Sequence, residues 1–74
     1  MIDPRAYVEP TAIVLPSARV WAFAHVRCGA VISEDVVVGS HAFIDQDVTG
    51  GPGARVGNGA MLFAGTVVDR DVFV

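Results

Sequence analysis

Two histidines and one cysteine are the side chains of this chain best suited to acid–base or nucleophilic chemistry. Histidine has an ordinary pKa near neutrality, so His25 or His41 could take a proton from an attacking amine. Cys28 is the only cysteine, which excludes an internal disulfide and a zinc site made of cysteines alone. The chemistry that the residue types favour is therefore general base catalysis by a histidine.

The elements that hold these residues follow from a period of six. Steps of six from Ile2 to Val74 meet branched aliphatic residues at every position except Gly50. Steps of six from Ala6 to Val72 meet only alanine, valine or threonine, and neither series contains a charge. Repetition at a fixed short period is the signature of a solenoid, and it predicts two columns of inward side chains.

The remaining phases of the repeat predict a turn in each hexad. All four prolines stand two residues after the aliphatic position, at Pro4, Pro10, Pro16 and Pro52. The next position holds glycine or aspartate in most hexads, and proline followed by glycine or aspartate suits a tight turn whose second central residue has a positive φ. Each hexad is therefore expected to form a short strand followed by a corner. A helix or an ordinary sandwich does not explain this period, so residues 1–74 are predicted to form one all-β domain, a β-helix.

Composition excludes several classes of function. The 74 residues are 53% hydrophobic and 18% charged, with a net charge of −3 and five scattered arginines but no lysine, so a basic surface for nucleic acid is not expected. The N-terminus lacks the layout of a signal peptide, and no apolar run approaches the length of a membrane span. A soluble cytoplasmic protein that binds neither nucleic acid nor membrane is the expectation.

The repeat resembles the pattern [LIV]-x-x-x-[STAV]-x of the left-handed parallel β-helix acyltransferases. In that family three hexads make one triangular coil, which implies about four coils here. Residues 20–26 (VWAFAHV) with residues 29–32 (GAVI) look like the opening of bacterial nucleotide-sugar N-acetyltransferases, and residues 71–74 (DVFV) look like their "DDVFVGP". The resemblance implies transfer of an acetyl group from acetyl-CoA, as co-substrate with no bound cofactor, to the amine of a UDP-linked amino sugar such as UDP-2-acetamido-3-amino-2,3-dideoxyglucuronate, for surface-polysaccharide synthesis.

The same resemblance implies roles for three residues. His25 is expected to act as the base, and Asn58, at the family's "KIQN" position, to hydrogen-bond the sugar or its amine. Trp21 is expected near the nucleotide end of the substrate, and no metal is implied. In stacked coils these residues lie on neighbouring edges of the prism, so a cleft between subunits would have to unite them.

Outward positions predict an oligomer. Residues 18 apart stack, so one outer column contains Tyr7, His25, Phe43 and Met61, and another contains Ile13, Val31, Thr49 and Val67. Contiguous exposed apolar columns mark interfaces, and the resembled family forms homotrimers with active sites between subunits.

Three departures from the family leave other interpretations open. Ala22 replaces the first histidine of the family's pair, Gly50 is expected to kink or loop its coil edge, and the later coils that complete the CoA site are missing, so the domain is expected to be incomplete at its C-terminal end. These departures favour the alternative of a non-catalytic scaffold or oligomerisation fragment. A γ-class carbonic anhydrase is the second alternative, but its zinc needs three histidines from two subunits, and Cys28 stands at the corner phase that proline fills elsewhere.

Overall fold

The computed structural model describes all 74 residues as eleven two-residue strands joined by turns, without a helix. The strands form three parallel sheets, which we call the first, second and third faces. The first face contains β1 (Tyr7–Val8), β4 (His25–Val26), β7 (Phe43–Ile44) and β10 (Met61–Leu62). The second contains β2 (Ile13–Val14), β5 (Val31–Ile32), β8 (Thr49–Gly50) and β11 (Val67–Val68). The third contains β3 (Arg19–Val20), β6 (Val37–Val38) and β9 (Arg55–Val56), extended by isolated bridges from Val20 to Ile2 and from Arg55 to Phe73.

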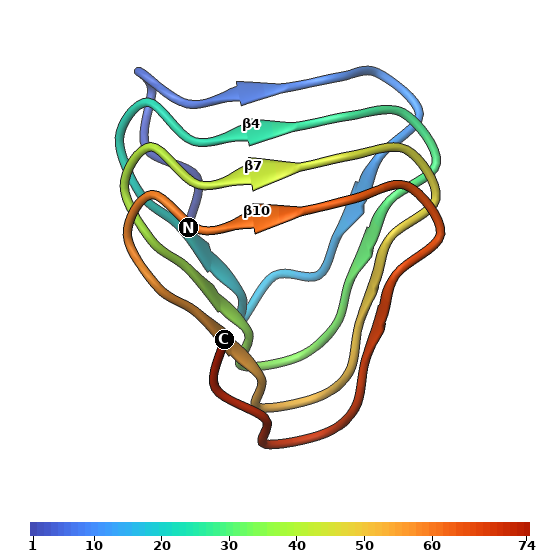
Figure 1. The fold of residues 1–74 in the computed structure, drawn as a ribbon. Helices are drawn as coiled ribbons and strands as arrows, with labels where there is room; N and C mark the ends of the chain where they lie inside the picture. Colours follow the sequence, from blue (N-terminus) through green and yellow to red (C-terminus); the bar gives the residue numbers. More distant parts are fainter.

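Strand pairing confirms the predicted parallel solenoid. Tyr7 pairs with His25, His25 with Phe43, and Phe43 with Met61, so each turn of the chain takes 18 residues, or three hexads. The first face thus spans three full turns from β1 to β10, close to the expected number of coils. Figure 1 shows the strands of each face stacked along the solenoid, with the chain passing from face to face around a triangular outline.

The core is the pair of inward columns that the period of six predicts. Fifteen buried residues form one cluster, all of them alanine, valine, isoleucine or leucine. The buried set contains no polar or charged side chain, and no buried side-chain nitrogen or oxygen lacks a hydrogen-bond partner. Burying a valine or isoleucine contributes roughly 1.5–3 kcal/mol, so these columns are the main stabilising feature of the fold.

Corner geometry confirms the turn prediction in part. From position 23 to position 71, every sixth residue has a positive φ, and seven of these nine residues are glycine or aspartate. The other two are Phe23 (φ 62°) and His41 (φ 61°), whose bulky side chains make a left-handed backbone unusual. In the first turn, the residues after Pro4, Pro10 and Pro16 have no positive φ. The corners therefore use two backbone conformations.

The prediction of a kink at Gly50 is wrong. Gly50 is buried in β8 and pairs in register with Ile32 on one side and Val68 on the other. Strand pairing needs only the backbone, so a glycine can take part in it. A Cβ added at Gly50 would lie 3.8 Å from side-chain atoms of Ile32 and Val36, an ordinary van der Waals distance. The loss of the aliphatic side chain therefore leaves the strand intact.

The chain has no helix that could span a membrane.

Candidate functional site

His25 lies on the outer surface of the first face, in a column of aromatic side chains. Its ring centroid is 4.9 Å from that of Tyr7 on β1 and 5.5 Å from that of Phe43 on β7, the latter in an edge-to-face arrangement. The alternation of a β-strand places Val26 in the core, so its neighbour His25 must point outward. The side chain of His25 is 36% exposed and can meet a ligand or a second protein.

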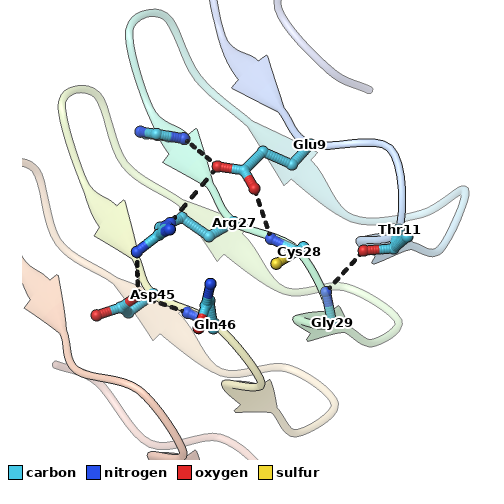
Figure 2. Close-up of polar contacts among 8 residues, drawn as sticks. Glu9, Thr11, Arg27, Cys28, Gly29, Asp45 and Gln46 are labelled. Atoms are coloured by element: carbon cyan, nitrogen blue, oxygen red, sulfur yellow. Dashed lines mark hydrogen bonds and ion pairs between the residues drawn. The ribbon is translucent and has the colours of Figure 1, made fainter.

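Glu9 orients the imidazole of His25. Glu9 follows β1, and its Oε2 lies 2.8 Å from Nε2 of His25. Its other oxygen, Oε1, accepts a hydrogen bond of 3.1 Å from the backbone N–H of Cys28. Figure 2 shows the carboxylate of Glu9 extending toward the backbone of Cys28 and toward Arg27 on the next turn. Glu9 thus joins two turns of the solenoid through both of its oxygens.

The pKa of Glu9 is lowered from its ordinary value. The main cause is the hydrogen bond with His25, which favours the charged carboxylate. Partial burial opposes this effect, whereas the hydrogen bond from the backbone N–H of Cys28 and the positive charge of Arg27 lower the pKa of Glu9 further. Glu9 is therefore ionised at neutral pH, where a carboxylate can only accept hydrogen bonds.

The ionised state of Glu9 assigns the tautomer of His25. Because the carboxylate has no proton to give, Nε2 of His25 must carry the hydrogen and donate it. In the neutral ring, Nδ1 is then left as the acceptor of a proton. A histidine held by a carboxylate is the arrangement of a general base, with the carboxylate fixing its orientation and stabilising the imidazolium that forms.

Arg27 and Asp45 continue a charged column beside the aromatic one. Nη1 of Arg27 lies 3.0 Å from Oδ1 of Asp45, and its Nε lies 3.5 Å from Oε2 of Glu9. Glu9, Arg27 and Asp45 are 18 residues apart, so acid, base and acid stack on successive turns. This column, and with it the partner of His25, was not predicted from the sequence, although charges that alternate in sign occur there at a spacing of 18.

His41 lies at the opposite side of the first face, in the corner that precedes β7. Its ring stacks on that of Phe23 with a centroid distance of 5.2 Å, and the guanidinium of Arg5 lies 5.4 Å from the centroid of Phe23. Arg5, Phe23 and His41 thus form an exposed stack over three turns. No carboxylate pairs with His41, so the orienting partner that His25 has is missing there.

Trp21 and Asn58 share the edge between the third and first faces. Oδ1 of Asn58 accepts a hydrogen bond of 2.9 Å from the backbone N–H of Ser40, one turn earlier. Gly39 packs so closely against this corner that an added Cβ would lie 2.7 Å from the backbone nitrogen of Asn58. Trp21 stands one turn before Gly39 in the same column, 40% exposed. Trp21 and Asn58 therefore lie on one edge, two turns apart.

The structure does not bring His25 together with Asn58 or Trp21. His25 is directed toward Glu9, which follows β1, whereas Asn58 and Trp21 occupy the corner that precedes the strands of the first face. Asn58 uses its carbonyl oxygen to stabilise the corner, so only its amide N–H groups are free to bind a ligand. The three residues predicted from the sequence thus form two groups in a single chain.

The single chain has no pocket, and no three metal-binding side chains lie close enough to hold an ion. Cys28 is a half-buried free thiol, next to Glu9 through its backbone N–H. A small substrate bound to one chain would therefore rest on an open face.

Comparison of the sequence with protein-family models and with curated proteins gives no match. The fold is shown by the repeat and by the three parallel sheets.

Proposed function

We propose that this chain belongs to a cytoplasmic N-acetyltransferase with the left-handed form of the hexapeptide β-helix. It transfers an acetyl group from acetyl-CoA to the amine of a nucleotide-linked amino sugar used in surface polysaccharides. The observation that carries the proposal is the hydrogen bond of 2.8 Å between His25 and Glu9 on an exposed aromatic face. This arrangement gives a solenoid of hexads an oriented base, which a purely structural face does not need.

The proposed reaction requires one proton acceptor and polar groups around the thioester. The amine attacks the thioester carbonyl, a C–N bond forms, and the C–S bond breaks as CoA leaves with its sulfur. The proton lost by the amine goes to Nδ1 of His25, while Glu9 holds Nε2 and stabilises the imidazolium, and it then passes to the departing thiolate of CoA. The free amide N–H groups of Asn58 can donate to a sugar hydroxyl or to the developing oxyanion.

A homotrimer supplies the enclosure that one chain lacks. Tyr7 and Met61 are 60% and 58% exposed on the first face, and Ile13 and Val67 are 53% and 73% exposed on the second. Apposing these columns in neighbouring copies would remove apolar surface from water. Contact of the first face of one copy with the second face of the next would also enclose the His25 group, which lies on the first face.

A non-catalytic scaffold is the second candidate. The absence of a pocket in one chain and the exposed apolar columns suit a module that only assembles. The hydrogen bond between Glu9 and His25 then serves to join the first two turns of the solenoid.

Direct detection of product separates the two candidates. The protein is incubated with acetyl-CoA and a panel of UDP-linked amino sugars, and acetylated sugar is followed by mass spectrometry. Product mass is preferred to thiol colour reagents because Cys28 is a free thiol that would react as well. We expect one sugar to gain an acetyl group at a rate proportional to enzyme concentration, and product from no sugar would favour the scaffold.

A further inference from the structure

The third face carries two arginines that have no acidic partner. Arg5 is paired with Asp3 and Arg27 with Glu9 and Asp45, whereas Arg19 on β3 and Arg55 on β9 make no ion pair and no side-chain hydrogen bond. Both arginines are exposed. They point outward because the residues that follow them, Val20 and Val56, point inward and are buried. Two free guanidinium groups on one face are notable in a chain whose net charge is −3.

The two arginines can converge on one ligand. Arg19 pairs with Val37 and Val37 with Arg55, so the arginines are two strand spacings apart, about 10 Å. Their long side chains can both reach a group that lies above Val37. The aspartates at the preceding corner, Asp35 and Asp71, make no ion pair with either of them.

Aromatic side chains border the same surface. Trp21 follows β3 directly, and the next two positions of its column are Gly39, which is buried, and the half-buried Gly57, so no second side chain stands beside the indole in this column. Phe73, which bridges to Arg55, is 75% exposed, and its ring lies near Gly57, 3.5 Å from the position of an added Cβ. We call Arg19, Trp21, Arg55, Gly57 and Phe73 the third-face strip.

We propose that the third-face strip binds a nucleoside diphosphate group. Arg19 and Arg55 would hold the phosphates, because a guanidinium matches phosphate oxygens with two parallel hydrogen bonds. The base would stack on the indole of Trp21, which tolerates any base. This proposal rests on the proposed function, because both of its substrates, the UDP-linked amino sugar and acetyl-CoA, contain a nucleoside diphosphate group.

Trp21 gives a direct readout, because it is the only tryptophan in the chain. Its fluorescence, excited at a wavelength that nucleotides do not absorb, is followed while UDP, ADP or uridine is added to the wild-type protein. We expect saturable quenching by a diphosphate and little by uridine. Tighter binding of UDP would assign the strip to the sugar substrate, and tighter binding of ADP would assign it to CoA. Equal affinities would assign it to the diphosphate group that both ligands share.

Arginine variants test the phosphate contacts. Arg19→Ala and Arg55→Ala should each weaken diphosphate binding by roughly tenfold, the usual effect of losing a hydrogen bond to a charged group. Arg70→Ala is the matched control, because Arg70 is an equally unpaired and exposed arginine at a corner outside the strip. Circular dichroism checks that all three variants melt like the wild type, as expected for outward side chains.

Two results would overturn the site: no saturable quenching by either diphosphate, or equal weakening by Arg19→Ala, Arg55→Ala and Arg70→Ala. The assay needs no turnover, so its failure differs from failure of the proposed function. Acetyl transfer without quenching by a diphosphate would contradict the binding site on the third-face strip and support the proposed enzyme. Quenching without acetyl transfer would support the binding site and contradict the proposed enzyme.

Discussion

Glu9 and His25 join the first two turns of the solenoid by a hydrogen bond of 2.8 Å between Oε2 and Nε2. Glu9 also accepts a hydrogen bond from the backbone N–H of Cys28, so one carboxylate both stabilises the stack and orients the proposed base. These two roles can be separated, because stability depends on the charge of Glu9 and catalysis would depend on Nδ1 of His25.

Glu9→Gln should lower the melting temperature by several degrees at about pH 7. The pKa of Glu9 in the folded state lies below its ordinary value of 4.5. The ionised carboxylate therefore contributes its full stabilisation above about pH 4.5, and this stabilisation is lost as the pH falls through the pKa of the folded state. Melting curves of wild type and variant should therefore differ at neutral pH and converge in acid. Glu34→Gln, at an exposed residue without an ion pair, should match the wild type throughout, and a constant difference between Glu9→Gln and wild type would disprove the linkage.

The inward phase can be tested with two neighbouring residues of β3. Val20→Asp places an unpaired charge in a fully buried column and should cost about 3–5 kcal/mol of unfolding free energy. Arg19→Asp changes an exposed side chain without an ion pair and should cost less than about 0.5 kcal/mol. Denaturant unfolding measures both, and similar losses would contradict the inward assignment. Arg27 would be a poor outward control, since it bridges Glu9 and Asp45.

Two glycines should respond in opposite directions to alanine. Gly50→Ala adds a methyl group whose nearest neighbours are 3.8 Å away and should stabilise the fold by about 0.4–1 kcal/mol, because alanine restricts the unfolded chain. Gly53→Ala forces a side chain into a corner with φ 74° and against the carboxylate of Asp71, and should destabilise by about 1–2 kcal/mol or more. Changes of the same sign in chemical denaturation would mean that one of these positions has a different backbone.

Assembly can be tested on the first face. Met61→Glu places a charge in the exposed apolar column, two strands away from His25, and should convert the proposed homotrimer to single chains of 7.8 kDa. Arg19→Glu, at an exposed position of the third face outside both apolar columns, is the control for added negative charge and should leave the homotrimer intact. Light scattering gives the mass directly. A folded wild type with the mass of one chain would contradict the homotrimer, and dissociation by Arg19→Glu alone would contradict an interface on the first face.

The sequence predicted the features that repeat and missed those that depend on single contacts. The inward columns follow from burial at every sixth residue, and the glycine and aspartate corners follow from their tolerance of positive φ. Phe23 and His41 adopt the same φ against their own preference, because hydrogen bonds from the adjacent turn, such as that between the N–H of Phe23 and the carbonyl of Arg5, fix the corner. Gly50 stays in register for the same reason.

The partner of His25 could not be found from the period alone. Residues that stack are 18 apart, but Glu9 and His25 are separated by 16, because the side chain of Glu9 reaches back along the face to the histidine of the next turn. Asn58 was correctly placed at a corner, but its hydrogen bond with Ser40 depends on the direction of one side-chain amide. Such contacts are set by side-chain direction, about which a hexad pattern says nothing.

The most direct test of the central claim is the rate of acetyl transfer by His25→Ala. With acetyl-CoA and the accepted amino sugar at saturation, kcat should fall about 10²–10⁴-fold, the usual effect of losing a positioned base. His41→Ala, which removes an exposed histidine without a carboxylate partner, should stay within a few fold of the wild type. Wild-type kcat in a folded His25→Ala variant would contradict the assignment of His25 as the base.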